Sequence, residues 1–316
     1  MRVYPLQQGK NISVFLNSDI TSVRDMILEH YDNKEPSGTL IFNWPFYGWW
    51  DIKDAPFELK RSLINESLYD LKDLKKKYNK LILLETEHLP FWVMSYMNDE
   101  WLKDIDEIWV MWLEALEFFK HSCTSARDKV RWVPMRYCSR IPHIGSSFDC
   151  QHNLGFFGQM SPERKKYWNH VEEAEWSAYH VNGLHPREVE DLTFHTKFIL
   201  DMPFRPDTET LSSQNVVRIF EMICMGKHVL TFPSTFNYFE GLVTEMEDPM
   251  EDIKDLKWKH PMDLSHLYKE LTYRDEDFHN YMVGCLMRYN EKYGDPYKDP
   301  IIDSIWDVKN PIFERI

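Results

Sequence analysis

The stretch QNVVRIFEMICMGKHVLTF, residues 214–232, decides which fold we expect for this chain. It reads as a short helix that is apolar almost all round, ends at Gly226 and leads into a buried strand. On a helical wheel, Arg218 and Glu221 lie with two methionines opposite the face that must pack on a sheet. That face consists of Val216, Ile219, Phe220, Ile223 and Cys224.

Two interpretations explain opposite charges one turn apart on a nearly buried helix. In the first, Arg218 and Glu221 form a surface ion pair, which contributes only about 0.3 kcal/mol. In the second, the helix start belongs to a ligand site, because helix N-termini favour phosphate. Arg218 could then grip a diphosphate with its forked donors, and Glu221 could accept two hydrogen bonds from vicinal ribose hydroxyls.

Strand-like and helical segments alternate along the chain, which predicts an α/β fold with parallel sheets covered by helices. Strand-like runs include residues 38–46, 80–91, 129–137, 154–159 and 197–204. The stretch 138–153 is polar and rich in turn residues, so it is the best linker candidate. We therefore expect one domain over residues 1–145 and a second over residues 146–316, whose last helix could cross back to the first. The expected ligand site is the cleft between them.

Composition narrows the class of protein. The 316 residues include 43% hydrophobic and 28% charged residues, as in folded soluble proteins. The net charge of −14 disfavours a nucleic-acid partner. Five widely spaced cysteines indicate a reducing compartment, and we expect a cytoplasmic protein. We found no apolar run of membrane-spanning length and no secretion signal at the N-terminus.

The sequence around Arg218 resembles the nucleotide-sugar motif of GT-B glycosyltransferases, in which an Arg-x-x-Glu helix is followed by Gly and a strand. Two upstream segments, LGFFGQMSPERKKYWNHV and HPREVEDLTFHTKFILDM, resemble the preceding elements of the C-terminal domain in that group. The ordered set covers roughly residues 153–240. The resemblance implies a GT-B fold, which has two Rossmann-like domains that face each other across a cleft.

The resemblance also implies roles for single residues. Glu221 would bind the donor ribose and Arg218 the diphosphate, while Arg164 would be a second cation for the leaving group. The rest of the donor site would comprise Gly158, Gln159 and Ser161 in a phosphate-side turn, and Asn215 near the helix start. Alternatively, Gly158 is an ordinary turn glycine and Arg164 a solvated helix charge. Retaining relatives often carry a second Glu eight positions before the ribose Glu; this chain has Ser213 there.

Acceptor-side residues are expected on the N-terminal domain. Glu87 with His88, after the strand at 80–84, is our preferred general base. Glu85 and Asp19 are weaker choices, and Asp19 is equally well explained as a helix cap. Aromatic residues in the run 42–51 could stack on an acceptor sugar or could fill the core instead: Trp44, Tyr47 and Trp49, with Phe46 and Trp50.

The expected function is transfer of a sugar from a nucleotide diphosphate sugar to a hydroxyl of a glycan or glycoconjugate. We expect neither an essential metal nor a cofactor, since protein cations and helix dipoles usually stabilise the leaving group in this fold. Glycosylation of modified DNA bases is one alternative, if Arg127, Lys129, Arg131, Arg136 and Arg140 form a basic stripe. A non-catalytic binding module on the same fold is another.

Overall fold

The computed structural model describes most of the chain, and every structural statement below concerns these residues. They are residues 6–16, 21–43, 70–85, 99–112, 115–116, 119, 124–147, 149–173, 177–182, 186–202, 216–232, 237–256 and 259–293. They form two compact units, which divide between Met135 and Arg136.

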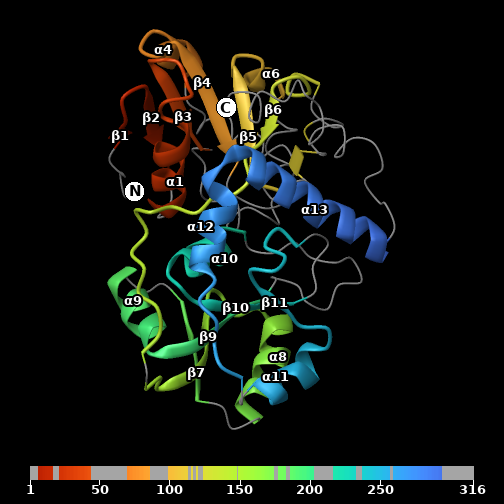
Figure 1. Ribbon diagram of the computed structural model, residues 1–316. Coiled ribbons are helices and arrows are strands. Elements are labelled where there is room, and N and C mark those ends of the chain that lie inside the picture. The colour runs from red at the N-terminus through yellow and green to blue at the C-terminus, as the bar shows by residue number, and fades with distance from the viewer. Residues whose placement is uncertain are drawn as a thin grey trace. The chain divides into compact units, whose positions relative to one another are not determined.

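The first unit contains a six-stranded sheet in the order β1-β2-β3-β4-β5-β6 (Figure 1). Strands β2 to β6 are parallel, and only the edge strand β1 runs antiparallel to its neighbour. The strands are β1 (Gln7–Gln8), β2 (Ile12–Phe15), β3 (Thr39–Phe42), β4 (Lys80–Glu85), β5 (Glu107–Val110) and β6 (Val130–Trp132). The helices are α1 (Thr21–Tyr31), α4 (Leu71–Lys75) and α6 (Asp99–Leu102).

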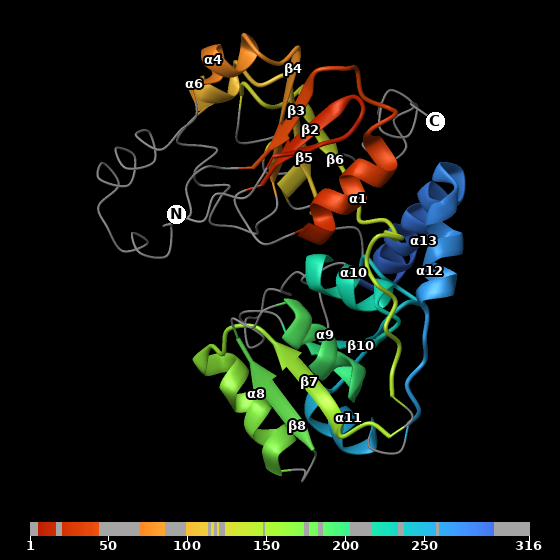
Figure 2. The same ribbon diagram turned by 90° about the vertical axis from the view of Figure 1, so that its left-hand side faces the viewer.

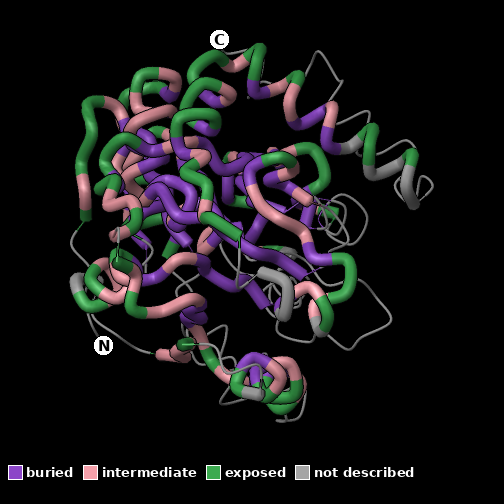
Figure 3. The backbone as a smooth tube through the Cα atoms, turned by 60° about the horizontal axis from the view of Figure 1, so that its bottom comes forward, coloured by how far each residue is buried: buried purple, intermediate pink, exposed green. Residues whose placement is uncertain are grey.

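The central strand β4 is buried over its whole apolar run. Leu81, Ile82, Leu83 and Leu84 have no measurable exposure, as expected for a parallel strand with both faces covered. Its last residue, Glu85, is also fully buried. Strands β3 and β10 are likewise buried at every residue, and Figure 3 shows buried segments in purple.

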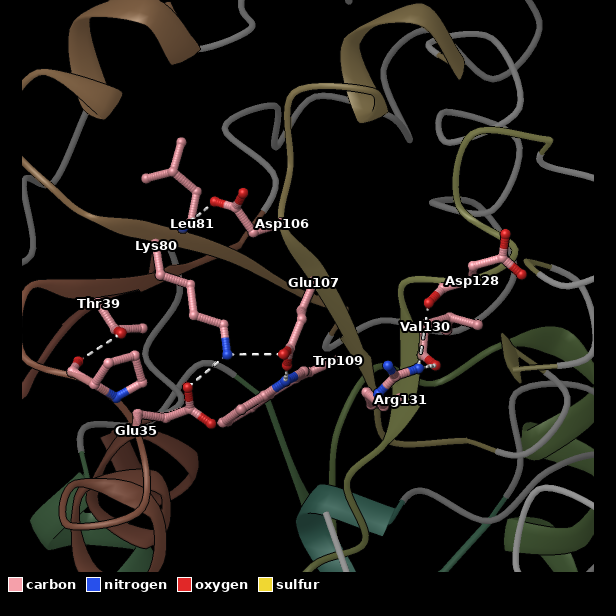
Figure 4. A network of polar contacts seen from close by, with 11 residues as sticks. Glu35, Thr39, Lys80, Leu81, Asp106, Glu107, Trp109, Asp128, Val130 and Arg131 are labelled. Carbon is pink, nitrogen blue, oxygen red and sulfur yellow. Dashed lines mark hydrogen bonds and ion pairs between the residues drawn. The ribbon is translucent and has the colours of Figure 1, made fainter. Parts of the chain in front are cut away.

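Charged residues of the first unit gather where its strands begin (Figure 4). Lys80 Nζ lies 2.7 Å from a carboxylate oxygen of Glu35 and 2.7 Å from one of Glu107. The other oxygen of Glu107 accepts a hydrogen bond from the indole N–H of Trp109 at 2.9 Å. Asp106 accepts the backbone N–H of Leu81 at 2.8 Å. The buried amine thus has two carboxylate partners at the amino ends of β4 and β5.

The second unit contains a five-stranded, entirely parallel sheet in the order β11-β10-β9-β7-β8. The chain starts in the interior at β7, adds β8 on one side and then adds β9 on the other. The strand order therefore reverses between β7 and β9, and this is the topological switch point where open α/β sheets bind ligands. The strands are β7 (His152–Phe157), β8 (Ala178–Val181), β9 (Thr196–Asp201), β10 (His228–Thr231) and β11 (Thr244–Glu245).

Helices cover this sheet, and Figure 2 shows α8 beside β7 and β8. One face packs on α8 and α11 through a buried cluster that includes Phe156, Trp168, Leu200, Leu230 and Ile253. The other face packs on α9 and α10. The helices of the unit are α8 (Pro162–Glu173), α9 (Pro186–Phe194), α10 (Val216–Cys224), α11 (Pro249–Leu256), α12 (Ser265–Tyr273) and α13 (Asp275–Tyr293).

The α/β fold class expected from the sequence is confirmed, with two units that each hold a largely parallel sheet. The helix and strand of the opening stretch are α10 and β10, and Gly226 ends the helix with φ +79°. The predicted linker, residues 138–153, extends too far, because β7 already begins at His152. Strand β8 was missed, since its sequence AYHV is short, has two adjacent polar residues at its centre and is only half-buried.

Candidate anion site at the carboxyl edge of the second sheet

Two arginines and one aspartate meet where β7 and β9 end. Gly158 directly follows β7, and Asp201 is the last residue of β9. Arg164 comes from the first turn of α8, and Arg218 from α10. The four residues come from both sides of the switch point, so the fold itself assembles this cluster at the edge where ligands bind.

Arg164 is a buried cation held by backbone carbonyls. Its exposed fraction is 5%, and its two terminal nitrogens donate to Gln159 O at 2.6 Å and Met202 O at 2.5 Å. Burial, together with the neighbouring charge of Arg218, lowers the pKa of Arg164 to about 10, although Asp201 acts in the opposite direction. The interpretation of Arg164 as a solvated helix charge was therefore wrong, because an arginine in open water would not be desolvated in this way.

Arg218 has a carboxylate partner that the sequence analysis did not consider. Its Nη1 lies 3.3 Å from Asp201 Oδ1, and the side chain is 17% exposed. Asp201 itself is 1% exposed. Arg164 is a second cation close by, and both Arg218 and Asp201 act on its pKa.

Both guanidinium groups lie over the aromatic ring of Phe156. The Arg164 guanidinium lies 5.2 Å from the centre of the ring and the Arg218 guanidinium 5.4 Å. Both distances are within the range of cation–π attraction. The imidazole of His180, on β8, stacks on the same ring with centres 5.5 Å apart and planes 23° apart. The ring of Phe156 thus contacts two guanidinium groups and one imidazole at the strand ends.

Gly158 must be a glycine because Arg218 lies against it. A Cβ at this position would be 2.8 Å from Arg218 Nη2, and φ is +143°. Its own polar groups are bonded to β8: the N–H donates to Val181 O at 2.9 Å, and the carbonyl pairs with His180 Nε2 at 2.6 Å. The glycine therefore admits a guanidinium, and its N–H already has an acceptor within the protein.

The remaining predicted donor residues lie around this cluster. Ser161 Oγ accepts the backbone N–H of Arg164 at 3.1 Å, so Ser161 is the N-cap of α8. Gln159 is exposed, and its carbonyl is the acceptor for Arg164 described above. Glu221 lies on α10, one turn beyond Arg218, and is half-buried. The structure thus brings Gly158, Gln159, Arg164 and Arg218 together.

Several predicted site residues lie outside the described part of the chain. They are Asn215 of the donor site, the base candidates Glu87 and His88, and Trp44, Tyr47 and Trp49 of the acceptor loop. The runner-up Asp19 also lies outside it. Their roles therefore remain predictions.

Asp201, His180 and Phe156 are the site residues that sequence reasoning missed. Asp201 gave a usable signal, because an acidic residue ends the apolar run FIL of β9 and must therefore lie at the carboxyl edge. His180 and Phe156 gave none, since a histidine in an unrecognised strand and a phenylalanine in a core strand look ordinary.

The basic residues named for a DNA-binding stripe do not all face solvent. Arg136 is buried, forms an ion pair with Asp275 and lies 4.8 Å from the centre of the Phe278 ring. The amine of Lys129 donates to three backbone carbonyls, at residues 102, 103 and 105. These two cations are used inside the protein, which weakens the DNA alternative.

Within the described ranges, no group of three or more His, Cys, Asp or Glu side chains could hold a metal ion. Over the same part of the chain, no helix combines the length and apolar character needed to cross a bilayer.

Comparisons with known proteins gave remote likenesses in structure. No family model and no curated protein sequence matches. A lipopolysaccharide outer core galactosyltransferase, WaaB, in its apo form, is 10% identical, with a TM-score of 0.46 over 87% of this chain and 99% of the other.

Two further solved structures give similar values. The glycosylation-associated protein complex Gap123 from Streptococcus agalactiae is 12% identical, with a TM-score of 0.41 over 91% of this chain. This chain covers 59% of that one, so it spans well under two thirds of its length. Sucrose-phosphate synthase from Thermosynechococcus elongatus is 10% identical, with a TM-score of 0.40, over 88% of this chain and 76% of the other. At these values the likenesses assign neither activity nor substrate.

Proposed function

We propose that this protein is a glycosyltransferase whose second unit binds a nucleotide diphosphate sugar at the carboxyl edge of its sheet. The observation that supports this best is the pair of guanidinium groups of Arg164 and Arg218 on the ring of Phe156, at the switch point. Two guanidinium groups at one place suit an anionic ligand with several oxygen acceptors. A diphosphate bridging ribose and sugar is such an anion.

The proposed roles follow from the chemistry of sugar transfer. As the bond between sugar C1 and the diphosphate oxygen breaks, negative charge grows on the leaving phosphate. Fixed cations stabilise that charge without having to reorient during the reaction. Arg218 would contact the diphosphate directly. Arg164, whose position is fixed by backbone carbonyls, would add to the positive electrostatic potential at the site. Glu221, one turn further along α10, would accept hydrogen bonds from the ribose hydroxyls.

The acceptor completes the reaction. Its hydroxyl oxygen bonds to sugar C1, and its proton passes to a general base, for which Glu87 and His88 remain our candidates. Trp44, Tyr47 and Trp49 would stack on the acceptor sugar. Two arginines can supply the positive charge that a divalent ion supplies elsewhere, so we propose a reaction that needs no metal and an acceptor that is a glycan or glycoconjugate.

Binding and hydrolysis of donors test this proposal. Calorimetric titration with UDP, GDP, dTDP and ADP should reveal tight binding of one base, and the matching nucleotide sugar should be hydrolysed slowly. Arg218→Gln should weaken binding about 30-fold or more, since a charge-assisted hydrogen bond to phosphate is lost. Glu221→Ala should weaken nucleoside diphosphate binding but leave pyrophosphate binding unchanged.

A matched control is Lys165→Gln. Lys165 neighbours Arg164 in sequence, yet it is exposed and pairs with Glu172 at 3.4 Å. This variant should bind the nucleotide as the unaltered protein does. Equal hydrolysis by the unaltered protein and Glu221→Ala would contradict the ribose assignment. Binding without any turnover across donors and acceptors would point to a binding module instead.

A further inference from the structure

Arg218 is held on three sides by residues of the two central strands. Its guanidinium lies over Phe156 of β7, and its Nη1 faces Asp201 of β9. Its Nη2 occupies the space that a side chain at Gly158 would fill. Because arginine is long and has many rotamers, a site that fixes it before the ligand arrives avoids an entropic cost of binding.

Asp201 is an unexpected residue in a site for anions. It is buried, it ends a strand, and its negative charge must repel the phosphate groups that the arginines attract. A guanidinium, however, carries five N–H donors in a planar fork, which is more than one carboxylate oxygen can accept. One edge can therefore bond to Asp201 while another edge faces a ligand.

We propose that Asp201 is a positioning residue, which orients Arg218 through a hydrogen bond and keeps that bond when the diphosphate is bound. The inference rests on the proposed function only in naming the diphosphate as the ligand. The acceptor oxygen of Asp201 orients Arg218, whereas the negative charge of Asp201 weakens binding of the anion.

Two substitutions separate the oxygen from the charge. Asp201→Asn keeps an acceptor oxygen of the same reach and removes the charge, whereas Asp201→Ala removes both. Asp201→Asn should bind the diphosphate as tightly as the unaltered protein or a few-fold more tightly. Asp201→Ala should bind about 10-fold more weakly, because Arg218 is no longer oriented. A purely structural role would lower the unfolding temperature in both variants without separating their affinities.

Titration calorimetry with inorganic pyrophosphate and with the nucleoside diphosphate of the screen above is the experiment. Binding that weakens 10-fold or more in Asp201→Asn would overturn the proposal, because the charge would then be essential. Binding that stays unchanged or tightens in Asp201→Ala would overturn it too, because Asp201 would merely compete for Arg218. If the Ala variant does not fold, a 10-fold loss of binding in the Asn variant would still overturn the proposal.

The two probes separate this inference from the proposed function. If pyrophosphate binding follows the expected order but no nucleotide binds, Asp201 positions Arg218 in an anion site of another kind, and the nucleotide assignment falls. If the nucleoside diphosphate binds to the unaltered protein and is insensitive to both substitutions, the inference falls and the proposed function stands. If neither probe binds to any variant, both are wrong.

Discussion

The two sheets place their buried charges at opposite ends. In the first unit, Lys80 lies at the amino end of its strand, between Glu35 and Glu107, and its charge is fully compensated within the protein. In the second unit, Arg164 and Arg218 lie at the carboxyl end and share one buried carboxylate, Asp201. The first arrangement links neighbouring strands through ion pairs, whereas we propose that the second binds an anionic ligand.

Strand order accounts for part of this difference. The described strands of the first sheet follow one another in sequence, so that sheet has no reversal of direction. The second sheet reverses between β7 and β9, and the connections on either side leave the strands in opposite directions. Charges at the reversal can therefore face a ligand, while charges at the opposite edge of a sheet serve stability. The predictions below test this division.

Lys80→Met should have the largest effect, on stability alone. It leaves the buried Glu35 and the partly buried Glu107 without this cation, which costs about 3 kcal/mol in comparable cases. Urea unfolding should show this loss, while pyrophosphate binding should stay unchanged. The triple substitution Lys80→Met, Glu35→Gln, Glu107→Gln should recover much of the stability. Weakened anion binding in a folded Lys80→Met protein would break the division proposed here.

His228 should make the second unit sensitive to acid. Its Nδ1 accepts the backbone N–H of Met262 at 3.0 Å, so its Nε2 carries the proton toward Thr244 Oγ1 at 2.8 Å. Burial, helped by Lys259, lowers the pKa of His228 to about 4 from 6.5. Between pH 4 and pH 6.5, His228 is therefore protonated in the unfolded chain but neutral in the folded chain. Stability should fall by up to about 3 kcal/mol as the pH drops from 6.5 to 4.

Unfolding midpoints across that pH range measure the effect. His228→Gln should remove this part of the pH dependence, and the exposed His266→Gln should leave it in place. An unchanged slope in His228→Gln would assign the acid sensitivity to other groups. Binding of pyrophosphate at pH 7 should be the same in both variants, since His228 begins β10 at the end of the sheet away from the arginines.

Gly158→Ala should weaken anion binding about 10-fold to 30-fold by displacing the guanidinium of Arg218. Gly241→Ala is the matched control, because Gly241 also has a positive φ, +77°, but nothing lies within 4 Å of a Cβ there. Both variants carry backbone strain of about 1 to 3 kcal/mol, and only the first should lose affinity. Equal affinities would show that Arg218 can move aside at no cost, and its preorganisation would then be unimportant.

Lys76→Ala should have the smallest effect. Lys76 pairs with Asp73 at 2.5 Å, but both side chains are well exposed. Such pairs contribute less than about 0.5 kcal/mol. The contrast with Lys80, four residues later, would show that burial and not proximity gives a lysine its importance in this unit. A loss above about 1 kcal/mol in urea unfolding would contradict that.

Sequence patterns predicted the elements that depend on local periodicity and capping. Gly226 predicted the end of α10, and unbroken apolar runs predicted β4 and β9. Patterns could not predict strand order, because the position of β8 beside β7 depends on pairing between segments far apart. We placed the domain boundary at residue 145 because the sequence there is rich in turn residues. The compact units divide at Met135, and turn composition does not show where packing contacts end.

The candidate site was predictable in outline only. The spacing of Arg218 and Glu221 on an apolar helix pointed to α10, and Arg164 and Gly158 were named with it. Asp201, a carboxylate partner of Arg218, lies 17 positions away on strand β9. A single sequence gives such a contact no signature, because opposite charges at that separation meet only once β9 and α10 have packed together.

The reversal of strand order in the second sheet also sets when its site can exist. Each strand of the first sheet pairs with its predecessor, so that sheet can grow at one edge as the chain leaves the ribosome. Gly158 and Asp201, by contrast, belong to neighbouring strands with all of β8 synthesised between them. A nascent chain that ends before α10 contains every described strand of the first sheet but lacks Arg218. The proposed anion site would therefore form only after residue 218 has been synthesised.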